Sequence, residues 1–106
     1  MRTFDTGATR DTTEGKLDIH RFLDRKVLLR YCGYLNDHRM QSDGQLREPD
    51  NYKKGIGQDV YMASMTRHFF SVWGGFEEGK IDQDELCALM FNVMGMLFEE
   101  MRDGRD

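Results

Sequence analysis

Five acidic residues lie between positions 77 and 85 of this 106-residue chain, within the stretch GFEEGKIDQDEL: Glu77, Glu78, Asp82, Asp84 and Glu85. Apolar segments flank the cluster, so its negative charge must be neutralised by water, by Lys or Arg partners, or by a metal ion. Carboxylate oxygens are the preferred ligands of Mg²⁺ and Mn²⁺, which usually share their coordination with substrate phosphates. Metal-dependent phosphate chemistry is therefore one hypothesis for this stretch.

Two other interpretations of the acidic stretch need no phosphate. Asp82 can cap a helix with Glu85 three residues later, as in a variant of the capping box, and acidic residues also favour the positive end of a helix dipole. Capping leaves the glutamates at 77 and 78 unexplained. The segment GKIDQDEL also matches the second half of an EF-hand calcium loop, but Gly74 and Phe76 occupy the first and third positions, where carboxylates are needed.

A second pattern runs along the segment that follows the acidic stretch. Glu85, Asn92 and Glu99 are spaced by seven residues, so on a helix they lie along one stripe. Asn92 stands inside the apolar run LCALMFNVMGML, and a buried amide without partners costs about 1–3 kcal/mol. Asn92 therefore either joins a polar network in the core or faces a binding site.

The preceding segment carries a matching stripe of polar residues. Ser64, Arg67, His68 and Ser71 have the i, i+3, i+4, i+7 spacing of one helix face. Arg67 can hold a phosphate with two parallel hydrogen bonds, or it can pair with one of the carboxylates. His68 is either a packed histidine or a ligand of the same site.

The elements that position these side chains are helical. Apolar residues recur with helical spacing in two long segments and in a third that Asp24 can break and cap, while long period-two alternation is absent. We expect an all-α fold, a small helical bundle of three main helices within a single domain. Asp59 is the expected N-cap of the central helix, and Gly74 and Gly75 its expected end. The expected segments are an extended arm at 1–17, helical segments at 18–40, 58–73 and 82–102, and a long loop at 41–57.

The long loop is the second place where a ligand could bind, because loops of this length in small domains are often functional. Lys53 and Lys54 are solvated charges in the simplest interpretation. Beside Asn51, Tyr52 and Gly55 they could instead close over a nucleotide.

Composition narrows the classes of partner. The net charge is −4, with 39% hydrophobic and 32% charged residues, which suits a soluble domain and disfavours binding of a nucleic acid polymer. The polar N-terminus does not resemble a signal peptide, and no apolar run is long enough to cross a membrane. Cys32 and Cys87 stand in apolar helical patterns and are expected to be buried free thiols. Together these features predict a cytoplasmic protein.

Several segments resemble a phage family identified as dATP/dGTP diphosphohydrolase (N-terminal region). They are FDTGATRD with a following GK, DNYKKGI in the loop, and YMASMTRHFFSVW followed by LCALMFNVMG. That family is similar to the MazG-like all-α nucleotide pyrophosphatases. The resemblance implies clustered carboxylates that bind Mg²⁺ or Mn²⁺, cleavage of a nucleoside triphosphate between its α- and β-phosphates, a homo-oligomer, and the host cytoplasm as the location.

The residue patterns and the resemblance together predict hydrolysis of a purine nucleoside triphosphate to the monophosphate and pyrophosphate. In this hypothesis Glu77, Glu78, Asp82 and Glu85 are metal ligands, and Glu85 also orients or deprotonates the attacking water. The substrate would be contacted by Lys53, Lys54, Arg67, His68 and Asn92. Two alternatives remain: a phage protein that binds a nucleotide without catalysis, and a helical protein-interaction module whose carboxylates only cap helices.

Overall fold

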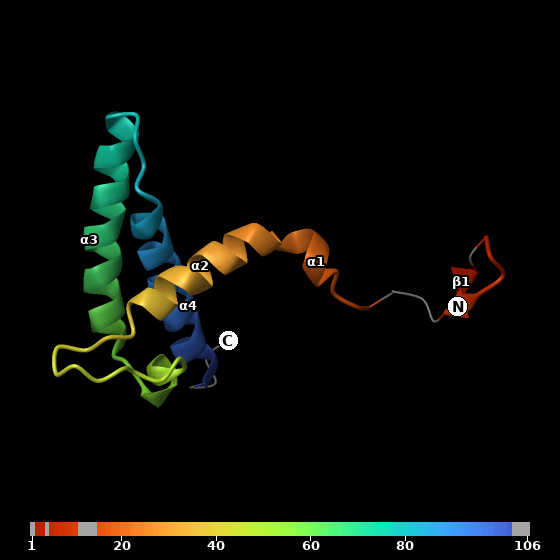
Figure 1. Ribbon diagram of the computed structural model, residues 1–106, viewed down its shortest axis with the longest axis horizontal. Helices are drawn as coiled ribbons and strands as arrows, with labels where there is room; N and C mark the ends of the chain where they lie inside the picture. Colours follow the sequence, from red (N-terminus) through yellow and green to blue (C-terminus); the bar gives the residue numbers. More distant parts are fainter. Residues whose placement is uncertain (1, 4, 11–14, 103–106) are drawn as a thin grey trace.

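The computed structural model describes residues 2–3, 5–10 and 15–102, and these residues form the predicted all-α fold (Figure 1). The helices are α1 (Ile19–Phe22), α2 (Arg25–Asp37), the 3-10 helix η1 (Asn51–Lys54), α3 (Gln58–Glu77) and α4 (Gln83–Arg102). The described strands are β1 (Arg2–Thr3) and β2 (Thr9–Arg10), which pair antiparallel with Arg2 opposite Arg10. Residues 1, 4 and 11–14 of the predicted arm lie outside the described part of the chain.

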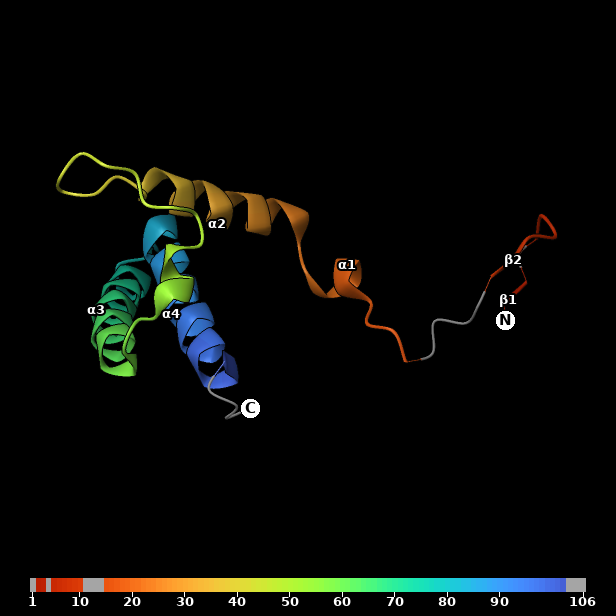
Figure 2. The ribbon, with the colours of Figure 1, turned by 90° about the horizontal axis from the view of Figure 1, so that it is seen from below.

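The helices α3 and α4 form an antiparallel hairpin, and α2 lies across one side of it (Figures 1 and 2). The strands β1 and β2 lie far from the helices in both views. Arg30 ties α2 to the start of α4, because its guanidinium donates to Asp84 Oδ1 at 2.6 Å and to Gln83 Oε1 at 3.0 Å. Tyr31 is buried in the same interface, and burial raises its pKa to about 12.

The start of α2 follows the sequence prediction. Asp24 has an extended backbone, and its carboxylate accepts a hydrogen bond from the Val27 amide at 2.9 Å. A side-chain acceptor at this position satisfies one of the amides that have no partner within the helix. The predicted break between a short first helix and α2 is therefore confirmed.

The central helix begins at Gln58 as expected, but its N-cap residue and its C-terminal end differ from the prediction. Gly57, not Asp59, is the N-cap of α3, and the helix continues through Gly74 and Gly75 to Glu77. A Cβ atom on Gly75 would lie 2.5 Å from the Lys80 carbonyl oxygen. Gly75 therefore permits the following turn to fold back closely onto the helix, and it does not terminate the helix.

The end of α3 is a Schellman turn centred on Gly79. The Lys80 amide donates to the Gly75 carbonyl at 2.8 Å, and the Gly79 amide donates to the Phe76 carbonyl at 3.1 Å. These are the two hydrogen bonds that define the motif, which requires a left-handed residue between them. Gly79 supplies it, with φ of +77°.

Replacing Gly79 by Ala should destabilise the chain by about 1–2 kcal/mol, the cost of a left-handed conformation for a residue with a Cβ atom. Apart from its two chain neighbours, no atom of the described residues lies within 4 Å of the Cβ position, so the loss would come from the backbone alone. Urea unfolding of the two proteins measures it. Equal unfolding free energies would show that the turn can adopt another geometry at no cost.

The buried core of the described residues is thin. Its buried hydrophobic side chains are Tyr31, Tyr61, Cys87 and Ala88. Cys87 is buried as predicted, but Cys32 is exposed, because α2 packs against the hairpin along one face only. Large apolar side chains on α3 therefore remain at the surface, among them Phe70 and Phe76 at 61% and 69% exposure.

Candidate functional site

A cavity of about 310 Å³ lies between α2, the α3–α4 hairpin and the segment that connects α2 to α3. This volume is at the lower end of the range for small-molecule sites in proteins. Its lining residues are Tyr34, Leu35, His38, Arg39, Arg47, Glu48, Pro49, Asn51, Tyr52, Ile56, Val60, Tyr61, Ser64, His68, Ala88, Phe91 and Asn92. The cavity thus collects side chains from all three long helices and from the loop that the sequence analysis singled out.

Polar groups from α3 and α4 form one wall of the cavity. His68 Nδ1 lies 2.6 Å from Glu85 Oε2. The Asn92 amide donates to Ser64 Oγ at 3.2 Å and to the Ala88 carbonyl at 2.9 Å. Asn92 is only 4% exposed and also lines the cavity. The first alternative weighed for it, a buried polar network, is therefore confirmed. That network also borders the cavity, and a binding role for Asn92 stays a prediction.

Aromatic rings form the second part of the cavity lining. Tyr52 meets Phe91 edge to face at 6.0 Å between ring centroids, and Tyr61 lies 6.1 Å from Phe91. Tyr61 is 1% exposed, and its hydroxyl has no hydrogen-bond partner among the described residues. Burial raises the pKa of Tyr61, with the negative charge of Glu99 adding to the shift, so the hydroxyl keeps its proton. A buried hydroxyl without a partner is costly unless a ligand or water completes it.

The connecting segment approaches the cavity as a short hairpin between residues 39 and 47. The Arg47 amide donates to the Arg39 carbonyl at 2.8 Å, and the Gln41 amide donates to the Gln45 carbonyl at 2.9 Å. Gly44 at the tip has φ of +83°, a conformation that glycine adopts readily. This hairpin brings Arg39 and Arg47 together beside the cavity.

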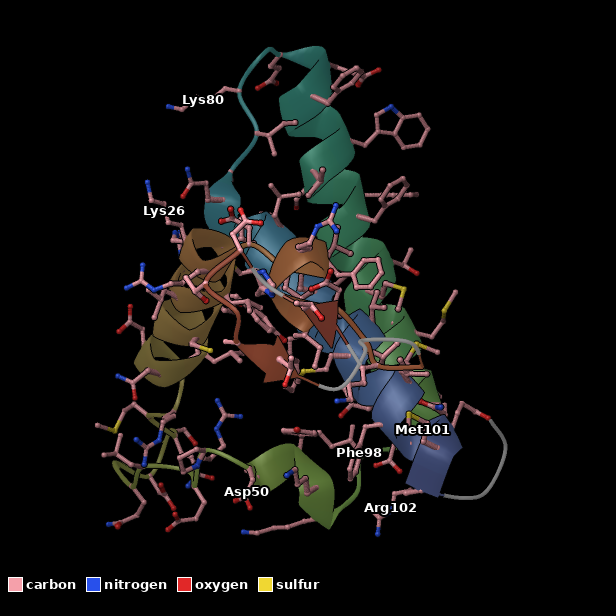
Figure 3. The ribbon with its side chains drawn as sticks, turned by 90° about the vertical axis from the view of Figure 1, so that its right-hand side faces the viewer. Lys26, Asp50, Lys80, Phe98, Met101 and Arg102 are labelled. Carbon is pink, nitrogen blue, oxygen red and sulfur yellow. The ribbon has the colours of Figure 1, made fainter. Side chains whose placement is uncertain are left out.

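The second half of the segment is fastened to the end of α4. Glu99 Oε1 accepts a hydrogen bond from the Ile56 amide at 3.1 Å, and Arg102 donates to the Lys53 carbonyl at 3.0 Å. Figure 3 shows Arg102 and Phe98 at the same end of the molecule as Asp50, which precedes η1. Tyr52 packs against Phe98 with 5.3 Å between centroids. These contacts hold Tyr52 in the cavity wall.

Three of the predicted site residues belong to this region. His68 and Asn92 line the cavity. Glu85 does not line it, but its carboxylate contacts His68. Arg67 lies elsewhere, in a shallow hollow of α3 that also includes Asp59.

Four other residues predicted for the site do not line the cavity: Lys53, Lys54, Glu77 and Glu78. The side chains of Lys53 and Lys54 are exposed and do not line the cavity. Glu77 follows His68 by nine residues of α3, which is about 14 Å along the helix axis. The turn that contains Glu78 and Lys80 lies at the opposite end of the hairpin from η1 (Figure 3).

The acidic residues of the 77–85 stretch do not converge. Across the described ranges of the chain, no three His, Cys, Asp or Glu side chains lie close enough together to hold a metal ion. Asp82 Oδ1 accepts a hydrogen bond from the Asp84 amide at 2.8 Å, and the Asp84 carboxylate pairs with Arg30. Asp82 therefore accepts a capping hydrogen bond at the start of α4, and Asp84 is ion-paired. Glu85 does not complete the predicted capping box, because it contacts His68 instead.

Arg39 and Arg47 were not among the site residues predicted from the sequence. The Asp43–Gly44 pair indicates a turn, but it does not fix the register that makes the two arginines partners. The structure pairs Met40 with Leu46, which leaves residues 42–44 in the loop.

A scan against protein-family models finds no match to this chain, and searches of curated proteins and of solved structures find none either. Among the helices that the structure describes, none is both long and apolar enough to cross a membrane.

Proposed function

We propose that the cavity binds a purine nucleoside triphosphate, and that the protein hydrolyses it to the monophosphate and pyrophosphate. The observation that carries the proposal is the convergence of aromatic rings and a polar wall on one cavity of suitable size. The segments that resemble the phage dATP/dGTP diphosphohydrolase family supply much of this lining, including Asn51, Tyr52, His68 and Asn92. That resemblance also supports a location in the host cytoplasm.

The aromatic part of the cavity lining suits the base of a nucleoside, and the polar wall suits the hydrogen-bonding atoms of its base and sugar. A flat aromatic base packs favourably against rings such as Tyr52 and Phe91. Hydrogen-bonding atoms of the base or sugar can be met by the Asn92–Ser64 pair and by His68. A few polar groups placed in a mostly apolar lining fix the orientation of a small ligand.

The His68–Glu85 pair is the candidate catalytic group. Glu85 engages Nδ1 of the imidazole, so Nε2 is the nitrogen that can accept a proton from an attacking water. The water oxygen forms a bond to the α-phosphorus, the bond from that phosphorus to the bridging oxygen breaks, and pyrophosphate leaves. Glu85 orients the ring and stabilises the imidazolium that results, as a carboxylate does in other nucleophile–base pairs.

Mg²⁺ or Mn²⁺ remains part of the proposal as the counter-ion of the triphosphate. The four carboxylates named from the sequence do not converge, so no step is assigned to a metal held by them. Mg²⁺ is often bound through one or two carboxylates plus substrate phosphates.

A homo-oligomer is part of the same proposal. Phe69, Phe70, Trp73 and Phe76 leave an apolar face on α3, with exposures from 50% to 69%. An apolar face of this kind commonly marks an interaction site. A second copy packed on it would also bring further carboxylates near the hairpin.

Binding without catalysis is the second candidate, and the lack of a three-ligand acidic cluster in the described residues favours it. Thermal unfolding with dGTP, in Mn²⁺ and in EDTA, together with pyrophosphate release, separates the candidates. The enzyme should be stabilised by nucleotide and release pyrophosphate with Mn²⁺. A binding protein should be stabilised in EDTA and release none, and an interaction module should respond to neither.

Replacing Val60 by Trp should fill the cavity and weaken dGTP binding at least tenfold, because Val60 lines it from a half-exposed position. Isothermal titration calorimetry measures the dissociation constant. Leu29→Trp is the matched control, since Leu29 lies on an exposed part of α2 outside the cavity. Unchanged dGTP affinity in a folded Val60→Trp protein would place the nucleotide site elsewhere.

A further inference from the structure

The hairpin of residues 39–47 presents two guanidinium groups to the same cavity. Arg39 and Arg47 are partners across the hairpin, since the amide of one donates to the carbonyl of the other. Both side chains line the cavity. They come from outside the α3–α4 hairpin, and thus face the cavity from a different element than His68 and Asn92.

Backbone carbonyls hold both guanidinium groups in position. Arg39 Nε donates to the Arg47 carbonyl at 2.7 Å, and Arg47 Nη2 donates to the His38 carbonyl. A longer contact of 3.4 Å joins Arg39 Nη1 to Asn36 Oδ1. A guanidinium has five N–H donors, so most of the donors of the pair still have no partner among the described residues.

The charge of this pair is not neutralised by ion pairing. Neither guanidinium forms an ion pair with a described residue. The other charged or titratable groups that line the cavity are Glu48, two histidines and three tyrosines: His38, His68, Tyr34, Tyr52 and Tyr61. Glu48 and Arg47 are both exposed, and Glu48 forms no ion pair with either guanidinium among the described residues. Glu85 is engaged by His68 on the far wall. Two like charges held side by side favour an anion that bridges them.

We infer that Arg39 and Arg47 form a polyphosphate-binding site, and that they hold the β- and γ-phosphates of the nucleotide. The nucleotide part of this inference rests on the proposed function, whereas binding of an inorganic polyphosphate does not. Paired guanidinium groups suit such an anion because each can donate two parallel hydrogen bonds to phosphate oxygens. This assignment replaces Arg67, Lys53 and Lys54 as the phosphate contacts.

The test is calorimetric titration with inorganic tripolyphosphate, dGTP, dGMP and deoxyguanosine. Arg39→Gln and Arg47→Gln should each weaken tripolyphosphate and dGTP binding at least tenfold and change deoxyguanosine binding less than twofold. The dependence of the dGTP dissociation constant on salt should become shallower in both variants. Glu48→Gln should tighten tripolyphosphate binding, because it removes a negative charge from the rim.

Two further variants separate charge from folding. Arg25→Gln makes the same change on α2 outside the cavity and should bind tripolyphosphate as the unmodified protein does. Arg39→Lys keeps the charge but loses the paired hydrogen bonds, so it should bind with intermediate affinity. Circular dichroism establishes that each variant is folded before it is titrated.

The outcomes distinguish this inference from the proposed function. Tripolyphosphate binding that is unchanged in folded Arg39→Gln and Arg47→Gln overturns the site. Nucleotide affinity that does not depend on the number of phosphates also overturns it, while leaving nucleotide binding intact. Tripolyphosphate binding without any affinity for dGTP supports the arginine site and removes the nucleotide from the proposal.

Discussion

Replacing Glu85 by Gln should lower the rate of pyrophosphate release by about 10²- to 10⁴-fold, because it disables His68 as the general base. Gln can still contact His68 Nδ1, but it cannot stabilise the positive charge that the ring acquires with the proton. The loss should appear in kcat, with KM nearly unchanged, because Glu85 meets the cavity only through His68. Steady-state assays of pyrophosphate release with dGTP and Mn²⁺ measure both constants.

Two control variants test whether the loss of activity is specific to Glu85. Asp37→Asn removes an exposed carboxylate at the end of α2 and controls for the change in net charge. Glu78→Gln distinguishes a site built on the His68–Glu85 pair from a metal site built on the acidic residues of the 77–85 stretch. A loss of turnover in Glu78→Gln comparable to that in Glu85→Gln would support a metal site built from the acidic stretch, with ligands brought together by another copy. Full activity of Glu85→Gln would exclude the His68–Glu85 pair as the catalytic group.

Replacing Gly95 by Ala should destabilise the chain by about 3 kcal/mol, at the upper end of the cost of overpacking a core. The added Cβ atom would lie 2.3 Å from Cζ and 2.4 Å from the hydroxyl oxygen of Tyr61. Tyr61 is the largest fully buried side chain, so its ring can move only by disturbing its neighbours. The loss should exceed the gain of about 1 kcal/mol that Ala has over Gly within a helix. Chemical denaturation measures the difference.

Gly33→Ala provides the matched comparison. Gly33 also lies within a helix, and beyond its chain neighbours and the nearby backbone of that helix no atom in the described part of the chain lies within 4 Å of its Cβ position. It should therefore gain up to about 1 kcal/mol from helix propensity alone. Tyr61→Leu combined with Gly95→Ala should recover part of the lost stability, because the two sites are in contact and their effects are coupled. A Gly95→Ala protein as stable as Gly33→Ala would contradict the close approach of α4 to Tyr61.

Local signals in the sequence predicted much of the fold. Asp24 marked the start of α2 because its capping hydrogen bond depends only on residues three positions away. The spacing of seven between Glu85, Asn92 and Glu99 predicted a shared stripe, and the structure buries Asn92 and Glu99 on it. Patterns of this kind can be recognised because a helix fixes the relative directions of its own side chains.

Features that depend on contacts between elements could not be predicted in the same way. Gly75 resembled a helix end, but its role is to admit the Lys80 carbonyl, which no pattern within the helix reveals. Glu85 was assigned to a metal cluster or a capping box, and its partner is instead His68 on α3. The choice among these partners depends on the register of α3 against α4, which tertiary packing determines.

In the oligomer proposed above, the thin core would make the folded population depend on protein concentration. The four buried hydrophobic side chains of the described residues make a small core, which supplies only part of the free energy that a chain of this size needs to remain folded. In the oligomer proposed above, burial of the Phe69–Phe76 face supplies part of the remainder, and that part depends on mass action. Specific activity per chain would then fall on dilution, and a nucleotide that binds the folded form would counteract the fall.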